Sequence, residues 1–325
     1  MKRIMVVLAA AAMLISCAPK QEAYQGPVKF IIETDMGNDI DDALALAIAL
    51  RAMDDGKAEL LAVGCHKLST SPAAFCDAVC TYYGHPGIPV AMSLTPVKES
   101  SSYVDYTQVE KDFEKSLTEY PEPVALYRKI LSEQPDNSVT FVSLGFGTTL
   151  AQLLESEPDD ISPLSGVDLV ALKTVGLSVM CGSYGSKQSK ISEYNVKNDI
   201  PAMKTVFEKW PTKIWQNPGE IGEVVLYPCE LIEQNLGYDT PNPVAEAYKL
   251  YMSMPYFRQC WDLLSVLYPL RPELFTESVP GTVTVDDEGY TWFTPSKDGR
   301  HIVLSATLDQ PQAMVDAITE MTYMK

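Results

Sequence analysis

The sequence has few basic residues and no cluster of them. Lysine and arginine together number 25 against 43 acidic residues, and the formal net charge is −18. Binding to nucleic acid requires a basic surface that neutralises phosphates, so DNA and RNA are excluded as partners. The excess of acid otherwise indicates only a soluble chain, unless several carboxylates gather at one point.

Linker-like stretches, internal repeats and a biased composition are also lacking. Hydrophobic residues make up 46% of the chain and charged residues 21%, which is typical of a packed globular protein and excludes disordered and collagen-like classes. A length of 325 residues permits one large α/β domain or two smaller ones. Because no segment has the composition of a linker, we expect a single domain over residues 27–325.

Long hydrophobic runs are absent except at the N-terminus. There Lys2 and Arg3 precede the apolar run 4–15, which is the layout of a secretory signal peptide and is too short to span a bilayer. The sequence Leu-Ile-Ser-Cys ending at Cys17 resembles a bacterial lipobox. We therefore expect cleavage after residue 16, a lipid on Cys17, a tether over 17–26 and anchoring to the periplasmic or cell-surface face of a bacterial membrane. An ordinary signal peptide with an incidental cysteine is the alternative.

Six further cysteines are predicted to be buried thiols, because a chain of this length does not need disulfides. Cys76 and Cys80 share one helical face with Phe75 and Val79, which favours core packing over a metal site. His66 is interpreted as a structural residue with a buried partner.

Short apolar runs alternate with segments of helical composition. Residues 28–34 are rich in β-branched side chains and predict a strand, and residues 41–53 predict the helix that follows it. Further strands are expected at 59–64, 88–91, 139–144 and 212–215, a central segment at 167–179, and helices at 72–83, 148–154, 200–208, 245–254, 262–270 and 312–322. This alternation predicts an α/β fold with a mostly parallel central sheet flanked by helices, and a small C-terminal β-containing segment at 283–286, 290–293 and 301–304. Residues 93–121 show no clear period and are expected to run over the surface.

Four carboxylates lie within eight residues at the first strand-to-helix turn: Asp35, Asp39, Asp41 and Asp42. Parallel α/β sheets open their binding crevice at this end of a strand. Helix capping explains Asp41 and Asp39, but not Asp35, which precedes the helix by more than a turn. A hard divalent cation explains the whole set, and Ca²⁺ suits protein carboxylates better than Mg²⁺ does. The spacing differs from an EF-hand loop, and the order of the acids fits a phosphatase poorly.

The segment 33–46, Glu-Thr-Asp-Met-Gly-Asn-Asp-Ile-Asp-Asp-Ala-Leu-Ala-Leu, resembles the N-terminal signature of the inosine/uridine-preferring nucleoside hydrolases. Weaker matches follow in the same order at 84–90, 143–150, 193–195, 220–222 and 261–262. The resemblance implies the Rossmann-like core of that family, one bound Ca²⁺, and hydrolysis of the N-glycosidic bond of ribonucleosides to ribose and free base. Homo-oligomers are a further expectation from it.

Carried onto this chain, the resemblance implies four metal ligands. They are Asp35, Asp42 as a bidentate ligand, Thr148 through its backbone carbonyl, and Asp262. Asp35 would also be the general base that deprotonates a metal-bound water.

The same resemblance implies the contacts to substrate. Asp41 would bind the ribose hydroxyls, and Glu193 and Asn195 would hold the far side of the ribose. Two extra residues separate Asp35 from the Asp41 pair compared with the commonest form of the motif, so Asp39 is an alternative contact to ribose or metal. Trp261 replaces a histidine and either stacks on the base or forms a pocket wall.

The sequence leaves the roles of three further residues undecided. Arg258 and Tyr256 are either leaving-group contacts or surface packing, and Glu220 is interpreted as a structural cap. Two other functions remain as alternatives: a related hydrolase with a non-nucleoside glycoside as substrate, and a non-catalytic lipoprotein that binds pentosides.

Overall fold

The computed structural model describes residues 24–95, 103, 113, 119–184, 191–238 and 242–323. The predicted signal peptide, Cys17, most of the predicted tether and most of the segment 93–121 lie outside the described residues. Among the helices that are described, none is long and apolar enough to cross a membrane.

Most of the strands belong to one large sheet. Their bounds are β1 Val28–Thr34, β2 Ala58–Cys65, β3 Val90–Met92, β4 Val139–Ser143, β5 Thr174–Met180, β6 Lys213–Asn217, β9 Thr276–Glu277, β10 Gly281–Val285, β11 Thr291–Pro295 and β12 His301–Ser305. The spatial order is β11-β10-β12-β6-β5-β4-β1-β2-β3, and β9 pairs with β12. From β3 to β12 the neighbours are parallel, whereas β9, β10 and β11 pair antiparallel. The predicted mostly parallel sheet with a C-terminal β segment is therefore confirmed.

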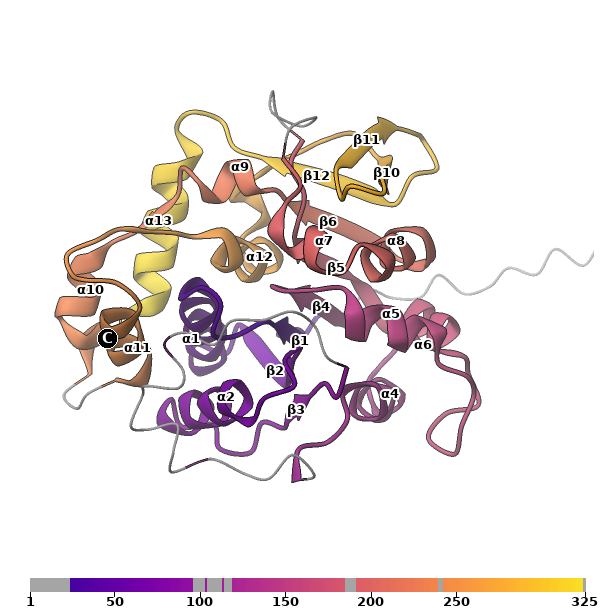
Figure 1. Cartoon of the computed structure of the whole chain (residues 1–325), viewed down its shortest axis with the longest axis horizontal. Coiled ribbons are helices and arrows are strands. Elements are labelled where there is room, and N and C mark those ends of the chain that lie inside the picture. The colour runs from indigo at the N-terminus through magenta and orange to yellow at the C-terminus, as the bar shows by residue number, and fades with distance from the viewer. Residues whose placement is uncertain are drawn as a thin grey trace, which may run out of the picture.

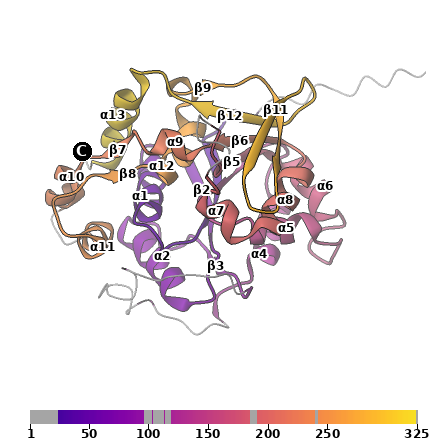
Figure 2. The same ribbon diagram turned by 45° about the horizontal axis from the view of Figure 1, so that its top comes forward.

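Helices cover both faces of this sheet. Their bounds are α1 Asp41–Asp54, α2 Thr70–Tyr82, α4 Pro123–Glu133, α5 Thr148–Glu155, α6 Gly166–Lys173, α7 Tyr194–Asn198, α8 Ile200–Lys209, α9 Gly219–Gly222, α10 Cys229–Glu233, α11 Pro243–Tyr251, α12 Trp261–Leu270 and α13 Gln310–Thr322. Figure 1 shows α1, α2, α12 and α13 on one side of the sheet and α4, α5, α6 and α8 on the other. A separate antiparallel pair, β7 Leu226–Tyr227 and β8 Arg258–Gln259, lies near α13 and α10 (Figure 2).

The residues of β1 explain why helices pack on both faces of the sheet. Phe30 and Ile32 pack into the cluster that contains α1 and α12, whereas Ile31 packs into the cluster that contains α5 and α8. Alternate residues of a strand point to opposite faces, so a nearly continuous apolar run is what a strand buried on both faces needs.

The strand order reverses between β1 and β4. From β1 the chain proceeds to β2 and β3 on one side, and from β4 it proceeds to β5 and β6 on the other. The carboxyl ends of two such strands diverge into a crevice, which is where open α/β sheets bind ligands. Asp35 directly follows β1 and Leu144 directly follows β4, so both lie at this crevice.

Besides the short elements α7, α9, α10, β7, β8 and β9, which were not predicted, two larger ones differ from the sequence expectation. The helix α4 was not predicted, because its buried face includes Arg128, which interrupts the apolar period. Arg128 is only 1% exposed, and its Nε donates to Asp159 Oδ2 at 2.8 Å. The segment 167–179 is not one central element: α6 ends at Lys173 and β5 begins at Thr174, with no glycine or proline to mark the boundary.

The predictions for cysteine and histidine are confirmed among the described residues. All six cysteines there are buried free thiols, and Cys76 and Cys80 lie in the core. His66 is fully buried, with its Nε2 3.0 Å from Glu33 Oε2.

Candidate active site

The turn after β1 is held by hydrogen bonds among its own residues. The Met36 N–H donates to Thr34 Oγ1 at 3.0 Å, and the Asn38 N–H donates to the Asp35 carbonyl at 3.3 Å. Gly37 has a φ of 101°, a conformation that residues with a side chain rarely adopt. The turn therefore delivers Asp35, 3% exposed, to the crevice and starts α1 at Asp41.

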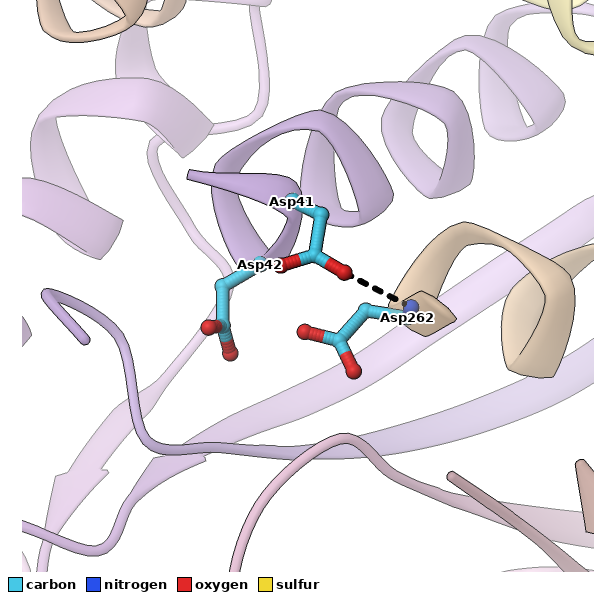
Figure 3. Close-up of side chains that lie close together, drawn as sticks. All are labelled: Asp41, Asp42 and Asp262. Atoms are coloured by element: carbon cyan, nitrogen blue, oxygen red, sulfur yellow. Dashed lines mark hydrogen bonds between the residues drawn. The ribbon is translucent and has the colours of Figure 1, made fainter. Parts of the chain in front are cut away.

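Three carboxylates converge where α1 meets α12. Asp41 and Asp42 lie in the first turn of α1, and Asp262 lies in the first turn of α12. The Asp262 N–H donates to Asp41 Oδ2 at 3.0 Å, and one oxygen from each of the three side chains lies within 4.8 Å of the others (Figure 3). All three side chains are buried, so this grouping is not a solvated acidic surface.

The buried carboxylates of this cluster would repel one another, and a bound cation would neutralise part of their charge. Burial raises the pKa of Asp41, Asp42 and Asp262 well above the usual range, and the neighbouring carboxylates raise each of them further. Burial also raises the pKa of Asp35 to about 6, against the opposing effect of the Lys67 ammonium. Like charges that share a buried site resist ionising together. A set of oxygen donors of this kind fits a hard divalent cation, which would let the carboxylates ionise.

A cavity of about 460 Å³ opens above the cluster. It is lined by Asp35, Asn38, Asp39, Asp41, Asp42, Leu144, Met180, Gly182, Ser183, Ile191, Ser192, Glu193, Tyr194, Asn195, Gly219, Glu220, Glu223, Trp261 and Asp262. Its size is that of a small-molecule pocket. Every residue that the sequence analysis placed in the site lines it, except Thr148. That residue begins α5, and its hydroxyl donates to Asp199 Oδ2 at 2.5 Å.

Glu193 and Asn195 form the wall on the β5 side. Glu193 accepts the backbone N–H groups of Gly182, at 3.1 Å, and of Asn195, at 2.9 Å, and burial raises its pKa to about 7. The Asn195 amide donates to the carbonyls of Leu144 and Met180 at 2.9 and 3.0 Å. Because both donors serve the backbone, the side-chain oxygen of Asn195 is the atom left for a ligand.

Trp261 also lines the cavity. Its Nε1 donates to the Gly219 carbonyl at 3.1 Å, which fixes the plane of the indole. The guanidinium of Arg258 lies 5.0 Å from the ring centroid of the indole, in cation–π contact. Arg258 itself does not line the cavity.

Two residues of the cavity lining, Glu220 and Asn38, and one residue behind it, Tyr103, escaped the sequence analysis. Glu220 is not a cap, because Pro218 is the N-cap of α9; its Oε1 instead accepts the Ser183 hydroxyl at 2.6 Å, at the cavity wall. Asn38 was passed over although it sits among the acids. Tyr103 was missed because the segment around it has no period, yet its hydroxyl donates to the Asp39 carbonyl at 2.9 Å. The signal for Glu220 was its place in the collinear motif 220–222.

The sequence profile of the inosine-uridine preferring nucleoside hydrolases matches residues 30–323 of the chain. The chain belongs to this family. It is a hydrolase acting on nucleosides, its family is metal-dependent, and its buried carboxylate cluster has the ligands to hold a metal. None of the curated proteins matches the chain.

Solved structures of nucleoside hydrolases share the fold of this hydrolase. An inosine-guanosine nucleoside hydrolase has a TM-score of 0.71 at 18% identity, over 91% of this chain and 99% of its own. A plant nucleoside hydrolase has a TM-score of 0.70 at 18% identity, over 92% and 100%. A purine-preferring ribonucleoside hydrolase from Gardnerella vaginalis has a TM-score of 0.69 at 18% identity, over 90% and 98%.

Proposed function

We propose that this hydrolase cleaves the N-glycosidic bond of ribonucleosides in a Ca²⁺-dependent reaction that releases ribose and free base. The observation that carries the proposal is the floor of the cavity, where Asp35 lies with the converging carboxylates of Asp41, Asp42 and Asp262. The ribose-contact candidates Glu193 and Asn195 and the aromatic Trp261 occupy the walls of the same cavity. The proposal thus assigns metal, sugar and base to different parts of one pocket.

The cation proposed for the floor is Ca²⁺. Asp35, Asp42 and Asp262 would hold it through their carboxylates, joined by the Thr148 carbonyl that the family resemblance implies. Asp41 contributes an oxygen to the same cluster. Ca²⁺ accepts several protein oxygens in flexible geometry, whereas Mg²⁺ keeps much of its water. When bound, Ca²⁺ would fix the ribose diol and supply a template that orients water toward C1′.

Asp35 is proposed as the general base. A cation on the floor would keep its carboxylate ionised, and Asp35 can then take a proton from the attacking water as the new C1′–O bond forms. The C1′–N bond breaks at the same centre, and its electron pair leaves with the base, which takes up a proton. The sugar is positively charged in the transition state, so the remaining carboxylates of the cavity favour it electrostatically.

Trp261 is proposed to stack on the leaving base. The hydrogen bond of its indole to Gly219 and its contact with Arg258 hold the ring at the cavity wall before substrate arrives. A preorganised aromatic surface costs little conformational entropy on binding.

Export and lipid anchoring through Cys17 are proposed from the N-terminal sequence alone. In a bacterial host, the full-length chain should incorporate labelled fatty acid and sediment with membranes, whereas Cys17→Ser should do neither. Assembly into homo-oligomers is a separate proposal, which light scattering of residues 18–325 tests directly.

A ribose-release panel tests the function. Residues 18–325 with Ca²⁺ should release ribose from purine or pyrimidine ribonucleosides, and a chelator should abolish the release. Asp35→Ala should lose activity by about 10²–10⁴-fold, the usual contribution of a general base. Asp160 is exposed, so Asp160→Ala should keep full activity. Absence of release from every nucleoside overturns the proposal. Turnover of another glycoside, or Ca²⁺-dependent binding without turnover, would replace it with one of the two alternatives.

A further inference from the structure

Lys67 is a buried lysine beside the carboxylate floor. The His66 N–H donates to the Thr34 carbonyl at 3.0 Å, which continues the pairing of β2 with β1 and brings Lys67 next to the turn that carries Asp35. The side chain is 0% exposed. A buried ammonium is costly unless it is paired and hydrogen-bonded, so its position requires an explanation from its contacts.

Those contacts form a chain that ends on Asp35. The Lys67 Nζ donates to Asn38 Oδ1 at 2.9 Å, and Asn38 Nδ2 donates to Asp35 Oδ2. An amide whose oxygen is held by an ammonium must present its NH₂ group elsewhere, so Lys67 fixes which way Asn38 faces. The amide in turn engages Oδ2 of Asp35 and leaves Oδ1 for other ligands.

We propose that Lys67 and Asn38 act as positioning residues that orient the Asp35 carboxylate for the metal and the attacking water. The inference rests on the proposed function in one respect only, the role of Asp35. Neighbours that orient metal ligands through hydrogen bonds contribute about 10–100-fold to metal affinity or activity. Asn38 lines the cavity, but its amide is committed to Asp35 and Lys67 and is not assigned to substrate.

A different role for Lys67 predicts the opposite sign. If its ammonium only offsets the negative charge of the floor, removing it makes the site more negative and tightens Ca²⁺ binding. If it orients Asp35 through Asn38, removing it weakens Ca²⁺ binding. The sign of the change in affinity therefore separates the two roles.

The experiment compares Asn38→Ala and Lys67→Met with the wild-type chain. Calcium affinity by titration calorimetry is expected to fall about 10-fold in both variants. In ribose release, kcat should fall about 10–100-fold while KM changes less than about threefold, because the sugar contacts are intact. Lys29→Met is the matched control: Lys29 is 8% exposed and pairs with Glu59 at 2.5 Å at the opposite end of β1. It should leave calcium affinity and kcat unchanged.

A double-mutant cycle distinguishes the positioning role of Asn38 from a general loss of folding. Asn38→Ala should weaken calcium binding in the wild type but not in the Asp35→Ala background, because the amide acts through Asp35. The melting temperatures in chelator should stay within a few degrees of each parent. Tighter calcium binding by Lys67→Met, or an equal effect of Asn38→Ala in both backgrounds, overturns the proposal.

Failure of the proposed function is recognised separately. If the wild-type chain binds calcium but releases no ribose, the proposed hydrolysis of nucleosides is refuted. The double-mutant cycle on calcium affinity then still tests the role of Asn38. A wild-type chain that binds no calcium overturns the positioning role together with the metal site.

Discussion

Arg258 holds Asp39 through two nitrogens of its guanidinium: Nε donates to Oδ1 at 2.7 Å, and Nη2 donates to Oδ2. Residues 219 apart in the sequence are thereby joined, and the turn after β1 is tied to the strand that leads into Trp261 and Asp262. A two-nitrogen contact of this kind fixes geometry as well as charge. The carboxylate of Asp39 is thus already paired, and its role as a contact to ribose or metal stays a prediction that competes with this pairing.

The Arg258 pairing predicts coupled mutational effects. Asp39→Asn and Arg258→Gln should each destabilise the protein, and the double variant should be little worse than either one. The side chains are 16% and 25% exposed, so the coupling energy should be on the order of 1 kcal/mol. Urea unfolding of the four proteins measures it. The exposed pair of Lys204 and Asp287 is the control and should show almost no coupling. Additive effects at Asp39 and Arg258 would show that the pair does not tie the turn.

Calcium affinity should fall as the pH is lowered from about 8 to about 6, because protons and the cation compete for the same oxygens. Burial raises the pKa of Asp35 to about 6 and places those of Asp42 and Asp262 well above the usual range. At low pH these groups are protonated, and binding must displace the protons. Calorimetry in two buffers of different ionisation enthalpy counts the protons released. Asp42→Asn should bind calcium more weakly and release fewer of them. An affinity that does not change across this range would contradict the assignment of these carboxylates as ligands.

The parallel core was predictable from the sequence because each strand is a short apolar run that both faces of the sheet bury. The bounds predicted for β1 and the acids after it are those of the structure. The contact between Asp41 and the Asp262 backbone was not predictable, because it depends on how α12 packs against α1. The burial of Lys67 and Arg128 was not predictable either. Lys67 donates to Asn38 in the turn after β1, and Arg128 pairs with Asp159, and both partners are distant in the sequence. Composition and hydrophobic period indicate the secondary structure and burial that a segment favours. They do not indicate which distant residues the fold brings into contact.

The buried carboxyl of Glu33 predicts a loss of stability as the pH rises. Burial raises the pKa of Glu33 to about 8 and lowers the pKa of His66 to about 3, so both are neutral in the folded protein near neutral pH. Between about 6.5 and 8 the folded state keeps the Glu33 proton and the unfolded state does not, and stability therefore falls as pH increases. His66 acts in the opposite direction and at lower pH: below about 6.5 the unfolded histidine takes up a proton that the buried one does not, so its contribution to stability is lost as the pH falls.

The variant Glu33→Gln isolates this effect. An amide resembles the neutral carboxyl, so the variant should lose the decline, which is on the order of 1–2 kcal/mol over this range. Chemical unfolding of both proteins in chelator, at several pH values, measures the difference in slope. Parallel curves would mean that Glu33 is ionised in the folded protein.

Trp261 should contribute to turnover through its ring. Trp261→Phe keeps an aromatic surface and should lose less than about threefold in kcat/KM for purine nucleosides, whereas Trp261→Ala should lose about 10-fold. Trp292, on β11, is 40% exposed and outside the cavity lining, so Trp292→Ala should leave kcat/KM unchanged. Equal losses in Trp261→Phe and Trp261→Ala would indicate that the hydrogen bond to Gly219, which phenylalanine cannot make, matters more than stacking.

Gly145 should tolerate no side chain, because the turn after β4 runs against Asp35. A Cβ at residue 145 would lie 2.8 Å from the Asp35 backbone nitrogen and 2.9 Å from its Cβ. Backbone atoms cannot move aside as a flexible side chain can, so Gly145→Ala must displace Asp35, the proposed general base. A displacement of about 1 Å at a reacting group costs about 10²-fold in rate. Gly87→Ala is the matched control, since a Cβ there meets nothing within 4 Å. Ribose release should fall by this factor in the first variant and stay at the wild-type rate in the second. If Gly145→Ala keeps full activity, the close approach of β4 is not what positions Asp35, and the hydrogen bonds from Asn38 must do so alone.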